Sequence, residues 1–280
     1  MDDITTVEKL LGADKFEIEP RGYPRLSAKY GKANADGITE ARFVKTRKQL
    51  PVAPSVIADD PHYRGSYREI TEEEIGEILD AFGQAARRAR EAGFDAVQVH
   101  GAHGYLFSQF LSPFTNQRTD RWGGILSNRL RLHRETYRKI RNAVGEDYPV
   151  LIKLGVEDGF AGGLTLAEGT QACRLLAETG YDAIEVSSGV RGEKYEGTEY
   201  KTKINKPSRE GYFRLPAREI KKNAKVPVIA VGGLKTIDMM EDMIRNREAD
   251  FIALCRPLIM EPGLIRKWEQ DPKKIPRCVH

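Results

Sequence analysis

The stretch Thr71–His100, TEEEIGEILDAFGQAARRAREAGFDAVQVH, contains the pattern of one helix followed by one buried strand. Thr71 and Glu74 have the spacing of a capping box, in which both side chains satisfy free backbone N–H groups at a helix start. Apolar residues then recur on one helical face: Ile75, Ile78, Leu79, Phe82, Ala85, Ala86 and Ala89. Gly93 is typical of a helix end. Asp95–His100 is short and apolar, as expected of a strand covered on both faces.

This alternation of helix and strand continues to the C-terminal part of the chain. Helical periodicity predicts helices over 127–144, 166–179, 216–223 and 236–247. Short apolar runs predict strands over 149–154, 182–186, 226–231 and 250–254. Strands that alternate with helices are typical of a parallel sheet, and a barrel of this kind needs about 250 residues. We therefore predict an α/β fold of the TIM-type (β/α)8 barrel class, with its βα units in residues 66–280.

Residues 1–65 differ from the rest of the chain. They are rich in Lys, Arg, Gly and Pro, and they contain only two weak strand candidates, Lys15–Ile18 and Ala41–Lys45. An eight-stranded barrel needs three more strands there. We therefore expect an atypical N-terminal segment in residues 1–65 and a barrel that is incomplete or rearranged at its N-terminus.

Composition restricts the class of protein further. The 280 residues are 40% hydrophobic, and no window of about 18 apolar residues suggests a membrane span. The acidic N-terminus lacks the pattern of a secretory signal, and three widely spaced cysteines do not suggest disulfides, so we expect a cytoplasmic protein. The net charge of +4 is dispersed, which argues against a nucleic-acid partner. No GxGxxG follows a strand, which argues against a Rossmann domain.

Several motifs at the predicted strand ends carry a family resemblance. They are His100-Gly-Ala-His103-Gly-Tyr105, Asn116-Gln-Arg118-Thr-Asp120-Arg-Trp-Gly123-Gly124, Ser187-Ser-Gly189, Ala230-Val-Gly232-Gly233 and Ala253-Leu-Cys255-Arg256-Pro257. In this order and spacing they resemble the Old Yellow Enzyme family of NAD(P)H-dependent flavin oxidoreductases. The resemblance implies FMN as cofactor, NADH or NADPH as reductant, and reduction of an activated alkene of the enone type.

By the same resemblance, His100 and His103 donate hydrogen bonds to the substrate oxygen, and Tyr105 is the proton donor. The chemistry suits these residue types, because hydride addition to the β-carbon of an activated alkene builds negative charge on its carbonyl oxygen. A phenol can then protonate the α-carbon as a general acid. The alternatives are that His100 is a core residue and Tyr105 only packs, or that His-x-x-His binds zinc, although a third ligand is lacking nearby.

The resemblance also implies cofactor-binding residues. Lys153 is expected beside the flavin, where a cation favours the reduced, anionic ring; alternatively, it forms an ion pair with Glu185 or Asp158. Gly232, Gly233, Cys255 and Arg256 are expected to bind the phosphate, because loops after the last two strands of such barrels often do so. The alternative for this set is two ordinary glycine turns and a surface arginine.

Two departures from the family pattern leave other functions open. The segment before Pro51 does not match the family, and Cys278 is not followed by a second cysteine of a Cys-x-x-Cys run, so an iron–sulfur cluster is not supported. One alternative is a flavin-less barrel that binds a phosphorylated ligand. The other is a chain that needs a partner, or a homo-oligomer, to complete the barrel, because unpaired edge strands favour pairing.

Overall fold

The computed structural model describes residues 17–18, 41–42, 50–57, 67–191 and 201–278. The chain divides into two compact units, Met1–Leu50 and Pro51–His280. In the first unit, β1 (Glu17–Ile18) pairs in antiparallel register with β2 (Ala41–Arg42). Both short strands lie within the two weak strand candidates of the sequence. The boundary expected between residues 65 and 66 stays a prediction.

The second unit is built on a five-stranded parallel sheet. Its strands are β5 (Val97–Gly101), β6 (Val150–Gly155), β7 (Ala183–Ser187), β8 (Val228–Ala230) and β9 (Phe251–Ile252). Each strand lies next to its successor in the chain, in the order β5-β6-β7-β8-β9. All five predicted strands are therefore confirmed, with the parallel topology. A separate parallel pair joins β3 (Val52–Ala53) to β4 (Arg68–Glu69).

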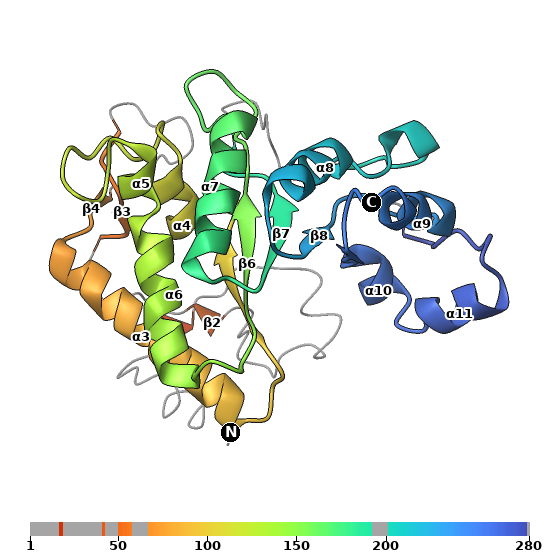
Figure 1. Cartoon of the computed structure of the whole chain (residues 1–280), viewed down its shortest axis with the longest axis horizontal. Helices are drawn as coiled ribbons and strands as arrows, with labels where there is room; N and C mark the ends of the chain where they lie inside the picture. The colour runs from red at the N-terminus through yellow and green to blue at the C-terminus, as the bar shows by residue number, and fades with distance from the viewer. Residues whose placement is uncertain (1–16, 19–40, 43–49, 58–66, 192–200, 279–280) are drawn as a thin grey trace. The chain divides into compact units, whose positions relative to one another are not determined.

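Helices follow the strands and pack against one another along the sheet. Figure 1 shows α3 (Glu72–Glu91), α6 (Arg131–Val144), α7 (Leu166–Thr179) and α8 (Arg214–Asn223) in succession, and the next helix is α9 (Ile237–Arg245). The capping box at Thr71 and Glu74 is present at the start of α3. No helix in the described part of the chain is long and apolar enough to cross a membrane.

Some helices differ from the sequence expectation. The helix predicted over 127–144 is interrupted, because the ψ of −6° at Leu130 separates α5 (Leu126–Arg129) from α6. The sequence did not predict the short helices α4 (Leu106–Leu111), α10 (Arg256–Met260) and α11 (Leu264–Gln270), nor the 3-10 turn η1 (Pro207–Arg209). Such short helices carry too few turns for apolar periodicity to be visible.

One face of the sheet forms the hydrophobic core. Strand alternation places on this face a register row that is at most 2% exposed: Val99, Ile152, Ile184 and Val228. These residues share one cluster with helix residues such as Ile140 and Leu176. Burial of each large aliphatic side chain contributes about 1.5–3 kcal/mol. The core therefore fixes which residues of each strand point to the opposite face.

The opposite face carries a register row of different chemistry. His100, Lys153, Glu185, Ile229 and Phe251 are aligned across the five strands. His100 is exposed, and Phe251 is 57% exposed. Within the described residues this row is therefore exposed at its two ends, at His100 and Phe251, whereas Glu185 in its middle is buried. The polar members of the row lie on β5, β6 and β7.

Candidate active site

The loop after β5 brings together the three residues predicted to act on substrate. The ring centroids of His100 and His103 are 4.8 Å apart, and those of His100 and Tyr105 are 5.2 Å apart. The backbone turns sharply here, because His103 and Gly104 both adopt left-handed conformations, with φ of 64° and 72°. Tyr105 precedes α4 and is 61% exposed. The phenol and two imidazoles therefore form one cluster at a strand end.

His103 is held by the last residue of β7 and by the residue that follows it. Its ring Nε2 lies 2.8 Å from the Oγ of Ser187. Its backbone N–H donates to the carbonyl of Ser188 over 3.0 Å. A non-glycine residue in the left-handed region needs such support. From the sequence, Ser187 was recognised only as part of the motif Ser187-Ser-Gly189. Its position at the end of a strand is the signal that could have marked it as a site residue.

Lys153 forms an ion pair on the face of the sheet that carries His100. Its Nζ lies 2.7 Å from Oε1 of Glu185, and Gln98 donates to Oε2 of the same carboxylate over 3.0 Å. The ion pair considered from the sequence is therefore confirmed with Glu185, whereas Asp158 makes other contacts. The role of Lys153 toward a flavin stays a prediction.

His100 lies beside this ion pair. Partial burial lowers the pKa of His100, the Lys153 ammonium lowers it further, and the Glu185 carboxylate opposes them. The imidazole is therefore neutral at neutral pH, with one ring N–H available for donation. A neutral donor can stabilise a developing oxyanion without first releasing a proton.

A buried carboxylate connects three loops at this end of the sheet. Asp158 is 0% exposed, and it accepts hydrogen bonds from Ser112 Oγ (2.6 Å) and from the backbone N–H groups of Leu164 (2.6 Å) and Val190 (2.7 Å). A Cβ at Gly189 would lie 2.1 Å from Asp158 Oδ1, so no side chain fits there. Burial raises the pKa of Asp158. This carboxylate positions the loop that supports His103.

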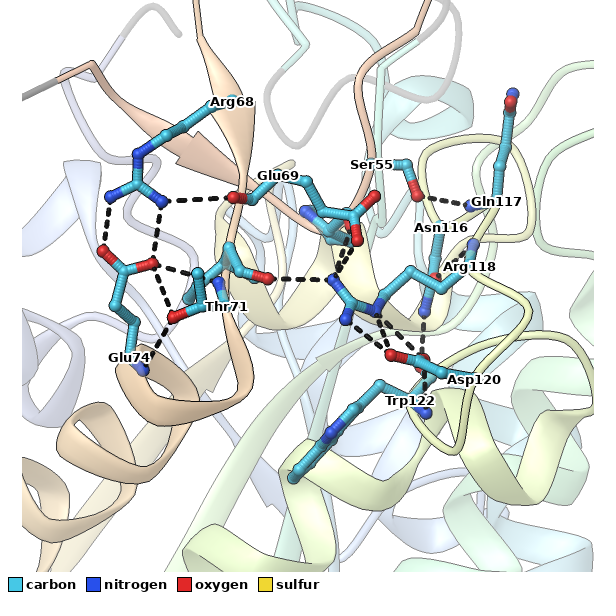
Figure 2. A network of polar contacts seen from close by, with 12 residues as sticks. Ser55, Arg68, Glu69, Thr71, Glu74, Asn116, Gln117, Arg118, Asp120 and Trp122 are labelled. Atoms are coloured by element: carbon cyan, nitrogen blue, oxygen red, sulfur yellow. Dashed lines mark hydrogen bonds and ion pairs between the residues drawn. The ribbon is translucent and has the colours of Figure 1, made fainter.

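The polar motif after α4 attaches the β3–β4 segment to the rest of the unit, as Figure 2 shows. Arg118 donates from Nη1 to the carbonyls of Pro54 (3.1 Å) and Ile70 (2.9 Å). Its Nη2 lies 2.6 Å from Oδ2 of Asp120, with which it forms an ion pair. The pairing lowers the pKa of Asp120. The motif is therefore architectural.

The two glycines after β8 lie against an aromatic ring. Gly232 and Gly233 have φ of 108° and 67°. A Cβ on either would approach the Tyr212 ring to 2.7–2.8 Å, so only glycine fits. The turn chemistry considered from the sequence is present, and the phosphate role of the glycines stays a prediction.

Cys255 and Arg256 follow β9. Cys255 is an exposed free thiol immediately before α10. The Arg256 guanidinium donates from both Nη atoms to the carbonyl of Lys201, over 3.2 and 3.3 Å. Because β5–β9 are parallel, these loops and the His100 loop lie at the same edge of the sheet. All the predicted site residues are therefore at the carboxyl ends of the strands.

The sequence profile of the NADH:flavin oxidoreductase / NADH oxidase family matches residues 32–274. The chain belongs to this family. The Old Yellow Enzyme assignment made from the motifs is thus confirmed.

Individual relatives in this family are longer than the chain. The chain is 38% identical over 253 residues to "NADH oxidase" of Thermoanaerobacter brockii. The aligned region covers 89% of the chain and 36% of that protein. The chain is 34% identical over 272 residues to "Cinnamate reductase" of Clostridium sporogenes, which covers 91% of the chain and 39% of that protein. The chain therefore spans little more than a third of the length of these curated relatives.

A solved structure confirms the barrel class of the fold. The old yellow enzyme homologue of Zymomonas mobilis superposes with a TM-score of 0.61 at 26% identity, over 81% of this chain and 63% of that one. The predicted TIM-type α/β barrel is thus confirmed as the fold class. The structure describes its parallel strands β5–β9 directly.

FMN is the cofactor of this family, and the residues present fit it. A phosphate needs N–H donors and a cation, and the left-handed backbone of Gly232 and Gly233 lies at the same sheet edge as the Arg256 guanidinium. A flat ring system needs an open surface with a nearby cation, and the His100–Lys153 row provides both.

Proposed function

We propose that the chain is the catalytic part of an FMN-dependent oxidoreductase that passes hydride from NADH or NADPH, through the flavin, to an activated alkene of the enone type. The observation that carries this proposal is the cluster of His100, His103 and Tyr105, whose rings lie 4.8 and 5.2 Å apart at the end of β5. The name of the cinnamate reductase relative agrees with reduction of a conjugated C=C bond.

The two histidines are proposed to bind and polarise the substrate oxygen. When bound, FMN supplies the hydride that adds to the β-carbon of the alkene. His100 and His103 would donate N–H groups to the carbonyl oxygen, on which negative charge grows as the hydride arrives. The contacts of His103 with Ser187 Oγ and with the carbonyl of Ser188 support this role, because they fix the position of its ring and backbone.

Tyr105 is proposed to complete the reduction by donating its phenolic proton to the α-carbon. Its side chain is 61% exposed, so an approaching substrate can reach the hydroxyl and solvent can return the proton. One hydride and one proton then convert the C=C bond to a C–C single bond, which balances electrons and charge.

Lys153 and the phosphate loops are proposed to hold the cofactor. Lys153 would lie beside the flavin ring, because it is on the same face of the sheet and in the same register row as His100. The loop backbone at Gly232–Gly233 and the Arg256 guanidinium would bind the phosphate. Cys255 lies immediately before Arg256 and would contribute backbone only.

An absorption spectrum of the purified chain from 300 to 600 nm tests this function. We expect two flavin bands that bleach when NADH or NADPH is added without oxygen, and that return when an enone is added. A spectrum that stays flat after FMN is added would contradict the proposal. Binding of inorganic phosphate or a phosphorylated ligand by such a colourless protein would instead favour a flavin-less barrel.

A further inference from the structure

The proposed function gives Glu185 no role, yet this residue lies in the middle of the register row that runs from His100 to Phe251. Glu185 is 7% exposed. Its carboxylate accepts a hydrogen bond over 2.7 Å from Nζ of Lys153, a residue of β6, and another over 3.0 Å from Nε2 of Gln98, a residue of β5. A buried carboxylate is unfavourable unless it is paired and hydrogen-bonded, and both conditions are met here. Three adjacent strands thus contribute one side chain each to this contact.

We propose that Glu185 is a positioning residue that compensates the charge of Lys153 on the His100 face of the site, with Gln98 holding its carboxylate in place. The register supports this proposal, because His100 is aligned with Lys153 and Lys153 with Glu185. Gln98 lies two residues before His100 on β5 and so shares its face. The inference about the flavin rests on the proposed function, whereas the inference about His100 does not.

Removal of the carboxylate charge should have two consequences. The groups of the described chain that act on His100 are Lys153 from β6, Glu185 from β7, and His103 and Tyr105 from its own loop. Without Glu185 the Lys153 ammonium is uncompensated, so protonation of His100 becomes less favourable. The same uncompensated cation would stabilise a reduced, anionic flavin on this face.

The variant Glu185→Gln tests the first consequence in the protein without flavin. It preserves the shape of the side chain and removes its charge. We expect the pKa of His100, followed by NMR of its ring protons and assigned with a His100→Asn variant, to fall below the wild-type value. Lys153→Met should move the same pKa upward, because it removes the cation instead. If the His100 titration is unchanged in both variants, the proposal is wrong.

Glu248→Gln is a matched control. Glu248 is also 7% exposed and also paired, with Arg214, but neither residue belongs to the His100 row. Its loss should reduce folding stability to a similar degree and leave the His100 titration at the wild-type value. If Glu248→Gln moves the His100 pKa as much as Glu185→Gln does, a general loss of stability explains the effect and the proposal fails.

The reduction potential of the holoprotein tests the second consequence. At a fixed solution potential, Glu185→Gln should raise the ratio of reduced to oxidised flavin about tenfold. This change corresponds to an increase of about 30 mV in the reduction potential of a two-electron couple. The double variant with Lys153→Met should lose this increase. An unchanged or lower ratio would overturn the role of Glu185 toward the flavin. If the wild-type chain binds no FMN, the proposed function fails, and the His100 titration still decides the role of Glu185.

Discussion

Nε2 of His103 lies 2.8 Å from Oγ of Ser187, so that a residue on the loop after β5 is held by the last residue of β7. The two residues are separated by 84 positions in the chain. The contact engages one ring nitrogen of His103, and the backbone bond to Ser188 fixes the left-handed turn that carries the ring. The orientation of this candidate substrate-binding side chain therefore depends on the β5–β7 arrangement of the sheet.

Ser187→Ala should reduce kcat/KM for an enone about 5- to 30-fold, because the lost hydrogen bond contributes about 1–2 kcal/mol to the orientation of His103. FMN content should stay the same. Ser188→Ala is the matched control, because the Ser188 hydroxyl is buried without a hydrogen-bond partner in the described part of the chain. Steady-state kinetics of both variants check this. Equal losses in both would mean that the Ser187–His103 contact is unimportant.

Tyr105→Phe should slow the oxidation of the reduced flavin by an enone about 100-fold or more, since general acid catalysis contributes on the order of 10²–10⁴-fold. Reduction of the flavin by NADH or NADPH should continue at the wild-type rate. Stopped-flow absorbance measures the two half-reactions separately. Tyr148→Phe, which removes a buried hydroxyl without a hydrogen-bond partner among the described residues, should affect neither. Equal slowing of both half-reactions by Tyr105→Phe would refute its role as proton donor.

Arg256→Ala should weaken FMN binding about 10- to 100-fold, because it removes a charged donor from the predicted phosphate loop. The flavin that remains after gel filtration, measured by absorbance, checks this. Arg174→Ala removes an exposed arginine that pairs with Glu178 on α7 and should leave FMN bound. Because the Arg256 guanidinium contacts only a backbone carbonyl among the bonds described, we expect little change in thermal stability. Full retention of flavin would contradict the phosphate assignment.

His133 should make folding stability depend on pH. It is 0% exposed, both ring nitrogens lack hydrogen-bond partners within the described ranges, and burial lowers its pKa to about 3. The folded pKa lies below the unfolded value of about 6.5, so the stability present above pH 6.5 is lost as the pH falls toward 3. Between pH 7 and pH 5 this loss is about 2 kcal/mol.

Urea denaturation of the wild-type protein and of His133→Phe at the two pH values measures this contribution. The free energy of unfolding of the variant should fall by about 2 kcal/mol less than that of the wild type, whatever its absolute stability. Parallel pH profiles for the two proteins would show that His133 is not kept neutral in the fold.

Arg118→Lys should destabilise the second unit by about 2–4 kcal/mol, because a single ammonium cannot replace the bonds to Pro54, Ile70 and Asp120 together. The Arg118 side chain is only 7% exposed, so the carbonyls of Pro54 and Ile70 would lose their hydrogen bonds in a place that water reaches poorly. Arg87→Lys changes an exposed arginine in an i,i+4 pair and should cost less than about 0.5 kcal/mol. Chemical denaturation distinguishes the two, and similar losses would mean that Arg118 is not structurally important.

The order and type of the main elements were predictable from the sequence because their signals are local. The capping box at Thr71 and the apolar face of α3 lie within a few residues of one another. Each of β5–β9 is a short apolar run next to a helix. The break at Leu130 was not predictable, because apolar periodicity runs through it. The motifs at the strand ends were enough to indicate the family and the candidate residues His100, His103 and Tyr105.

Local sequence patterns thus specify the alternation of strands and helices and the residue types at the strand ends. The partners of those residues depend instead on how the strands and loops pack in three dimensions. Lys153 had two possible carboxylate partners in the sequence, and the register of β6 and β7 selected Glu185. Asp158 was instead buried by three converging loops. This difference arises because register and loop packing join residues far apart in the chain, whereas periodicity and capping act over a few residues.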